Sequence, residues 1–163
     1  MYCRGMSCHS AQISTRSPEE TCALAQALGP RLAPGDCLLL EGEVGAGKTH
    51  FARCLIQAML EVPEDVPSPT YTLVQTYPGG HGEIWHSDLY RLSDITEIEE
   101  LGLLEAFETA ICLVEWPDRL GDLAPPDALT LRLDAPTGDD TRTVTFEWSG
   151  RAWADRIKDL CNA

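Results

Sequence analysis

Long hydrophobic runs are absent from the sequence. The longest apolar stretches, such as Cys37–Leu40, stop well short of the roughly 18 residues that a membrane-spanning helix needs. Internal repeats, low-complexity tracts and an apolar N-terminal signal region are absent as well. We therefore expect no membrane partner, and the 163 residues suit one compact domain with a continuous core.

Lysine is scarce. The chain has 12 lysines and arginines against 26 aspartates and glutamates, and only Lys48 and Lys158 are lysines. The net charge is −14, and the arginines are scattered through acidic sequence rather than gathered in one stripe. Because tight binding of a nucleic-acid backbone requires clustered cations, direct binding of RNA or DNA is disfavoured.

Disulfide and metal spacings are also lacking. The 7 cysteines form no CxxC pair and no Cys/His spacing typical of zinc sites, and their number is odd. Four of them lie in apolar helix or strand patterns, where free thiols behave as small hydrophobic side chains. We therefore expect reduced structural thiols and a reducing cytoplasmic location.

Helix and strand patterns fill the chain beyond a short N-terminal segment. Residues 1–14 match neither a helical nor a strand period, so we expect a loose arm followed by a single domain over residues 15–163. Ser17, Pro18 and Glu20 together predict a capped helix start. Further helices are expected at 48–60, from about 93 to 100, 103–107 and 151–161, and strands at 37–41, 70–77, 83–86, 110–115, 129–133 and 144–148.

The order of these elements indicates the fold class. Strands alternate with helices in the first two thirds of the chain, which indicates a three-layer α/β fold around a mostly parallel sheet. Leu129, Leu131 and Leu133 alternate with polar residues, and so do Val144 and Phe146. A late antiparallel hairpin with one buried face is therefore expected.

The segment from Gly42 to Thr49 matches the pattern G-x-x-x-x-G-K-[ST], the Walker A motif or P-loop. It stands directly after an expected strand and directly before an expected helix, as the motif requires. Its glycines let backbone N–H groups turn toward a phosphate, and the helix N-terminus adds partial positive charge. Lys48 is expected to reach the β- and γ-phosphates of a nucleotide, and the Thr49 hydroxyl to join a Mg²⁺ shell.

Two carboxylates are candidates for the acid that a P-loop needs for hydrolysis. Glu115 ends the apolar run from Ile111, which is typical of a Walker B strand that presents one carboxylate at its C-terminal tip. His86 and Asp88 end another strand and share a face of it, so Asp88 could serve as a second acid or orient the attacking water. Thr70, in a Ser-Pro-Thr turn, is a candidate γ-phosphate sensor.

The motifs at Gly42–Thr49, Ser68–Val74, His86–Arg91 and Leu113–Pro117 together resemble the TsaE family, the small P-loop ATPases of bacterial tRNA threonylcarbamoyladenosine synthesis. The resemblance runs in order from about residue 17 to residue 116. It implies a P-loop NTPase-like fold and an ATP- and Mg²⁺-dependent ATPase. It further implies action with the subunits TsaB and TsaD, which modify adenosine 37 of tRNA, so that tRNA is reached only through the complex.

The resemblance also implies roles for single residues. Thr49 and Glu115 would coordinate Mg²⁺, Asp88 would be needed for hydrolysis, and Trp116 would lie beside the nucleotide. The nucleotide-binding set is then Gly42, Val44, Gly45, Ala46, Gly47, Lys48, Thr49 and Trp116.

One residue departs from the family pattern. Family members usually carry a second hydroxyl residue after the P-loop threonine, and here that position is His50. An imidazole cannot reproduce the hydrogen bond of a small hydroxyl, so the rate of hydrolysis is expected to differ while nucleotide binding survives. Two other functions stay open at this stage, a small-molecule P-loop kinase and a nucleotide-gated binding module with negligible turnover.

Overall fold

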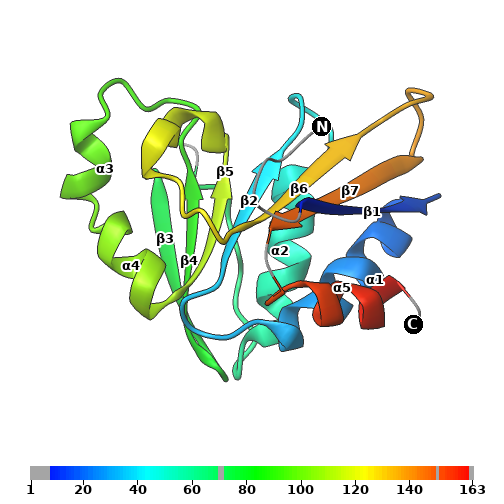
Figure 1. The fold of residues 1–163 in the computed structure, drawn as a ribbon, viewed down its shortest axis with the longest axis horizontal. Coiled ribbons are helices and arrows are strands. Elements are labelled where there is room, and N and C mark those ends of the chain that lie inside the picture. The colour runs from blue at the N-terminus through cyan, green and yellow to red at the C-terminus, as the bar shows by residue number, and fades with distance from the viewer. Residues whose placement is uncertain (1–7, 70–71, 150, 162–163) are drawn as a thin grey trace.

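A seven-stranded sheet forms the centre of the protein (Figure 1). The computed structural model describes residues 8–69, 72–149 and 151–161. The strands are β1 (Cys8–Thr15), β2 (Cys37–Glu41), β3 (Val74–Gly79), β4 (Gly82–Asp88), β5 (Ile111–Glu115), β6 (Leu129–Asp134) and β7 (Arg142–Ser149). The α-helices are α1 (Pro18–Leu28), α2 (Lys48–Met59), α3 (Thr96–Glu100), α4 (Leu103–Thr109) and α5 (Ala154–Cys161), and 3₁₀ helices span Gly29–Arg31 and Pro117–Leu123. No helix within the described ranges is long and apolar enough to cross a bilayer.

The strand order is β1-β7-β6-β2-β5-β4-β3. The central strands β6, β2, β5 and β4 pair in parallel, whereas β3, β7 and β1 pair antiparallel to their neighbours at the two edges. Five strands therefore run in one direction, and β6 and β7 form the expected late hairpin. The predicted mostly parallel α/β fold is confirmed.

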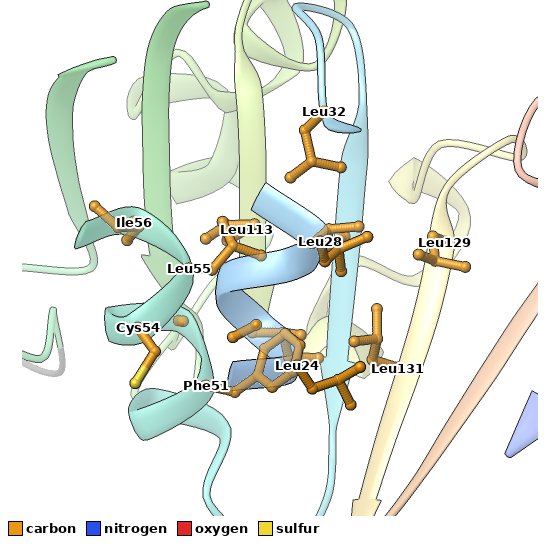
Figure 2. Packing of buried hydrophobic residues seen from close by; sticks show 14 of the residues in the cluster. Leu24, Leu28, Leu32, Phe51, Cys54, Leu55, Ile56, Leu113, Leu129 and Leu131 are labelled. Atoms are coloured by element: carbon orange, nitrogen blue, oxygen red, sulfur yellow. The ribbon is translucent and has the colours of Figure 1, made fainter. Parts of the chain in front are cut away.

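Helices cover both faces of the sheet, because side chains along the buried strands alternate between the faces. Leu38 and Leu40 of β2 point to the face covered by α1, α2 and α5, and Cys37 and Leu39 point to the face covered by α3 and α4. Figure 2 shows the first of these two layers, in which leucines of α1 and α2 pack with Phe51 against strand residues of the sheet. This layer packs α1 and α2 against one face of the sheet.

The expectation of a loose arm over residues 1–14 is wrong for residues 8–14. These residues form most of β1, which pairs antiparallel with β7 along its whole length from Cys8↔Ser149 to Thr15↔Arg142. Ala11 and Ile13 pack against the core, while Gln12 between them is exposed. Small side chains give this alternation a weak signal, and backbone pairing with the distant β7 holds the strand. Residues 1–7 lie outside the described residues.

The connection between the strands expected at 70–77 and 83–86 is shorter than predicted. Pro78 and Gly79 belong to β3 and pair with Glu83 and Gly82, so that the chain reverses at Gly80 and His81. Proline is tolerated there because β3 is an edge strand, where a missing N–H interrupts no hydrogen bond to a further strand. The capped start of α1 is confirmed, since the Glu20 amide donates a hydrogen bond of 3.1 Å to the Ser17 hydroxyl.

The expectation that the cysteines carry only free thiols is wrong for one pair. Cys22 of α1 and Cys54 of α2 are joined by a disulfide. They lie on neighbouring helices, and the sequence distance of 32 residues gave no local pattern by which to pair them. Cys37 and Cys112 are buried free thiols on adjacent strands, as the apolar strand patterns predict.

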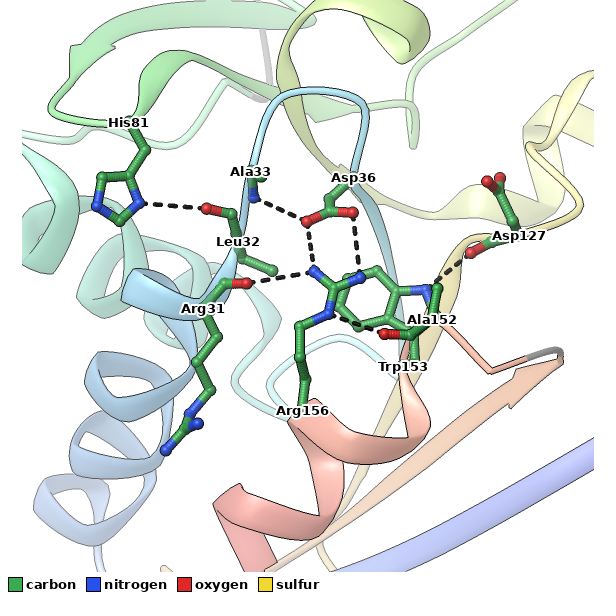
Figure 3. A network of polar contacts seen from close by, with 9 residues as sticks. All are labelled: Arg31, Leu32, Ala33, Asp36, His81, Asp127, Ala152, Trp153 and Arg156. Atoms are coloured by element: carbon green, nitrogen blue, oxygen red, sulfur yellow. Dashed lines mark hydrogen bonds and ion pairs between the residues drawn. The ribbon is translucent and has the colours of Figure 1, made fainter.

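A polar network joins α5 to the loop before β2 (Figure 3). The Arg156 guanidinium donates to both carboxylate oxygens of Asp36, at 2.6 and 3.4 Å, and to the backbone oxygen of Arg31 at 3.2 Å. Its guanidinium carbon also lies 3.8 Å from the ring centroid of Trp153. The same Asp36 carboxylate accepts from the amide of Ala33 at 2.8 Å. One side chain thus fixes the C-terminal helix against the start of the central strand.

We expect Arg156→Ala to lower the free energy of unfolding by roughly 1–2 kcal/mol, because it removes a bidentate ion pair and leaves the half-buried Asp36 carboxylate with fewer partners. Arg156→Lys keeps the charge but not the fork, so it should recover only part of the loss. Urea unfolding measures both values. Arg151→Ala, which changes an exposed arginine just before α5, is the control. An Arg156→Ala protein as stable as this control would show that the network does not stabilise the fold.

Candidate functional site

The Walker A segment forms the loop between β2 and α2. β2 ends at Glu41, and α2 begins at Lys48 directly after Gly47, which has a left-handed φ of 106°. Gly42 has a φ of 144°, and a Cβ atom there would lie only 2.7 Å from the backbone oxygen of Leu133. Only glycine fits this position, because the loop passes so close to the end of β6. The loop therefore turns tightly around the N-terminus of α2.

Lys48 is buried within the loop that it follows. Its Nζ atom donates to the backbone oxygens of Gly42 and Glu43 at 2.5 and 2.9 Å and lies 4.3 Å from the ring centroid of Trp116. Burial lowers the pKa of Lys48, and the nearby carboxylates of Glu115 and Asp88 act in the opposite direction. The one lysine of the motif is thus held at the mouth of the loop, close to both acids.

Glu115 is the centre of a buried polar cluster at the C-terminal end of β5. Its Oε1 atom accepts a hydrogen bond of 2.8 Å from the Thr49 hydroxyl, and its Oε2 atom lies 2.7 Å from Nε2 of His86. Glu115 is 2% exposed and His86 is fully buried. A buried carboxylate is stable only when its oxygens have partners, so these two contacts make the burial of the Glu115 carboxylate possible.

Asp88 stands beside Glu115 at the same edge of the sheet. The two residues are directly paired in the parallel register of β4 and β5. Asp88 is 5% exposed, and its Oδ1 atom accepts from the backbone N–H of Tyr90 at 3.0 Å. The Thr49 hydroxyl and two carboxylates are oxygen donors of the kind that a hard cation such as Mg²⁺ prefers, so the residues present fit that ion.

Trp116 forms one wall of the site. It directly follows Glu115 and has a left-handed backbone with φ of 58°, which is uncommon for a bulky side chain. Its ring lies 4.8 Å from that of Tyr90, measured between centroids, at an angle of 45°. The backbone conformation of Trp116 places its ring at the opening of the loop, next to Lys48.

These groups surround one cavity of about 400 Å³. It is lined by Val44, Gly45, Gly47, Lys48, Thr49, His50, Asp88, Tyr90, Glu115 and Trp116. Most of the residues that sequence reasoning selected therefore meet at one place. Gly42 and Ala46 belong to the loop but do not line this cavity, while Thr70 lies outside the described residues and its role stays a prediction.

Two site residues escaped the sequence analysis or were left without a role. The Arg142 guanidinium at the start of β7 donates from Nε to the backbone oxygen of Ala46 at 2.9 Å and so braces the loop. His86 was noticed only as a neighbour of Asp88, not as the partner of Glu115. No local signal pairs Arg142 with a loop 96 residues earlier in the chain.

The comparisons with known proteins bear on this site. Residues 15–144 match the family described as "Threonylcarbamoyl adenosine biosynthesis protein TsaE". The chain belongs to the TsaE family. The matched region contains the whole Walker A loop, β4 and β5, and therefore every group described above.

Individual TsaE proteins are similar over most of their length. The chain is 39% identical over 148 residues to the tRNA threonylcarbamoyladenosine biosynthesis protein TsaE of Bacillus subtilis, which covers 90% of this chain and 89% of that protein. It is 41% identical over 119 residues to the protein of the same name from Rickettsia conorii, covering 73% and 68%. The crystal structure of Bacillus subtilis YdiB superimposes with a TM-score of 0.75 and 32% identity, covering 96% of this chain and 94% of the other. The resemblance and the P-loop fold expected from the sequence are confirmed.

In this TsaE-family chain, the imidazole of His50 turns toward α1. Its Nε2 atom lies 3.1 Å from the backbone oxygen of Pro18. His50 therefore contacts the neighbouring helix and also lines the cavity. A second cavity of about 290 Å³ lies between the first turn of α1 and the loop, lined in part by Pro18, Gly47, His50 and Arg142.

We expect Gly42→Ala to lower the free energy of unfolding by roughly 2–3 kcal/mol, because the new methyl group meets a backbone oxygen that cannot move freely and the φ is strained. Gly45→Ala is the matched control. It also has a positive φ of 86°, but nothing lies within 4 Å of the added Cβ, so a loss of only about 1 kcal/mol is expected. Urea unfolding without nucleotide measures the free energy of unfolding of both variants. Equal losses in the two would contradict the close approach of Gly42 to the Leu133 oxygen.

Proposed function

We propose that this chain binds ATP with Mg²⁺ and hydrolyses it in the service of tRNA threonylcarbamoyladenosine synthesis. The observation that carries the proposal is the buried cluster of Glu115 with Thr49 and His86, next to Lys48 at the mouth of a Walker A loop. A loop alone would bind phosphate, but a fixed carboxylate at its side is what hydrolysis needs.

The loop residues supply the phosphate contacts. When nucleotide is bound, backbone N–H groups of the loop and the N-terminus of α2 face the phosphates, and the Lys48 ammonium balances their charge. The Trp116 ring and the Val44 side chain flank the same cavity. The nucleotide is therefore held mainly by backbone and one cation, which suits a chain with a net charge of −14.

Thr49 and Glu115 are the residues that would hold Mg²⁺, and the ion would neutralise charge that develops on the phosphate oxygens. His86 acts through Glu115: by occupying Oε2 it fixes the carboxylate and keeps Oε1 toward Thr49. Asp88 is the proposed group that orients the attacking water, and Thr70 is the proposed sensor of the γ-phosphate.

The partners are proposed from the family and from the rim of the site. TsaE relatives are named for the same tRNA modification, so TsaD and TsaB are the proposed protein partners, in the cytoplasm. Val44 is 78% exposed and Tyr90 is 47% exposed, and both line the nucleotide cavity. An exposed apolar rim around a nucleotide site is suited to a subunit that docks over bound nucleotide. tRNA would then be reached only through the complex.

Glu115→Gln tests the assigned chemistry. We expect it to retain ATP binding and to lower Mg²⁺-dependent hydrolysis by about a hundredfold or more, because the amide keeps the shape but lacks the charge. Phosphate release measures turnover, and titration with a fluorescent ATP analogue measures affinity. Turnover by Glu115→Gln at the wild-type rate would transfer the essential role to Asp88.

Lys48→Ala should lose tight binding of the ATP analogue, whereas Lys158→Ala, which changes the exposed lysine on α5, should behave as wild type.

ATP should strengthen the association of the chain with a TsaD-containing complex, because nucleotide and subunit meet at one rim and their binding is linked. Light scattering with ATP, with ADP and without nucleotide measures the association. With saturating ATP, Val44→Ser should weaken it by about tenfold, while Val62→Ser, at another exposed valine after α2, should not. The proposed arrangement is overturned if the association is equally strong with and without nucleotide and if the isolated chain binds bare tRNA tightly in a gel shift at physiological salt.

A further inference from the structure

A sulfur pair lies beside the nucleotide loop. The disulfide between Cys22 and Cys54 joins the second turn of α1 to the second turn of α2, with 5.4 Å between the Cα atoms. The Nε2 atom of His50 lies 3.9 Å from the Cys54 sulfur, and the two sulfurs and this nitrogen all lie within 4.8 Å of one another. His50 is the residue after the Walker A threonine and lines the nucleotide cavity, so the disulfide directly adjoins the site.

A second cysteine pair in the same protein provides a contrast. Cys37 and Cys112 are direct partners in the register of β2 and β5, yet they remain free thiols. Both are buried, and burial raises the pKa of each, to about 12 for Cys112. Two cysteines that lie close together are therefore not bonded in every part of this fold, and the surroundings of Cys22 and Cys54 differ from those of the buried pair.

The surroundings of the bonded pair permit exchange with small thiols. Cys22 and His50 are partly exposed, while Cys54 is 5% exposed. A small thiolate can thus attack the Cys22 sulfur and release Cys54 as the leaving thiolate. A neighbouring imidazole favours this step, because it stabilises the departing thiolate and can deliver a proton to it.

The disulfide lies near the contacts that α1 makes beside the Walker A loop. The first two turns of α1 are tied to α2 at two neighbouring points, by the disulfide at Cys22 and by the contact of 3.1 Å between His50 and the Pro18 oxygen. The cavity of about 290 Å³ between that turn and the loop is lined by residues of both, including Pro18, Thr21, Gly45 and His50. At the other end of the two helices, Gly29 approaches Leu55 and Met59 closely without any covalent link.

We propose that Cys22 and Cys54 form a reversible thiol–disulfide couple that sets how firmly the N-terminus of α1 is held beside the Walker A loop. In reduction, two molecules of a small thiol supply two electrons and two protons. The Cys22–Cys54 bond breaks, two protein thiols form, and the small thiols leave as one disulfide. Oxidation by a small-molecule disulfide runs the same exchange in reverse, so atoms and electrons balance in both directions.

The couple acts on nucleotide affinity, a consequence that rests on the proposed function. With the disulfide closed, one wall of the cavity beside the loop is fixed before nucleotide arrives, so less ordering is needed on binding. With the disulfide open, the packing of α1 on α2 persists, but its first turns are held by noncovalent contacts alone. The oxidised protein should therefore bind a fluorescent ATP analogue with a Kd lower by about threefold or more.

The first arm of the test follows the thiols. The full chain is equilibrated in buffers of reduced and oxidised glutathione, trapped with an alkylating agent and analysed by peptide mass mapping. Cys22 and Cys54 should change together in one two-electron transition, while Cys37 and Cys112 stay reduced throughout. If both residues remain fully open to alkylation in oxidised glutathione, or if no thiol buffer opens the disulfide, the proposal is overturned. Stoichiometric zinc retained by the reduced protein and lost in Cys22→Ser would overturn it in favour of a metal site.

The second arm measures the Kd of the ATP analogue in both redox states. Cys22→Ser and Cys54→Ser should each resemble the reduced wild type in either buffer. Cys161→Ser, which removes the exposed free cysteine on α5, should keep the full redox dependence. Equal affinities of oxidised and reduced wild type would overturn the proposal. Absence of nucleotide binding in both states would instead defeat the proposed function, while the thiol arm still decides whether the couple exists.

Discussion

A buried carboxylate is the constraint on which the rest of the site depends. Glu115 is almost inaccessible to water, and a carboxylate in that position is stable only when its oxygens are engaged. One partner, Thr49, comes from the helix after the phosphate loop, and the other, His86, comes from the adjacent strand. The requirement to satisfy one side chain therefore locks α2, β4 and β5 into a single arrangement.

The two-residue period of the strands places this cluster. On β5, Ile111 and Leu113 point toward α1 and α2, and the next residue on that face is Glu115. On β4, Ile84 points the same way and is followed by His86 and then Asp88, in register with β5. The apolar stripe that packs the helices thus becomes polar where it reaches the end of the sheet. Core and site are consecutive parts of one face.

Local patterns made much of this predictable. The Walker A loop, the strands around it and the acid at the tip of β5 follow from spacing within a few residues, and so does the alternation of strands and helices. What escaped prediction depends on contacts between distant segments. The strand β1 has only Ala11 and Ile13 to mark its buried face, and it exists because β7 pairs with it. The same holds for Arg142, whose loop contact spans 96 residues, and for the disulfide across α1 and α2.

Charge limits the kinds of ligand that suit the site. A chain with a net charge of −14 repels polyanions over its surface as a whole, so attraction for phosphate has to be local. It is local here because it comes from oriented backbone N–H groups, the N-terminus of α2 and the Lys48 ammonium, with the Arg142 guanidinium bracing the loop behind them. Fixed dipoles act over a few ångströms and can hold the short phosphate chain of a nucleotide. They cannot offset the repulsion along an extended RNA backbone, which agrees with the proposal that a partner subunit contacts the tRNA.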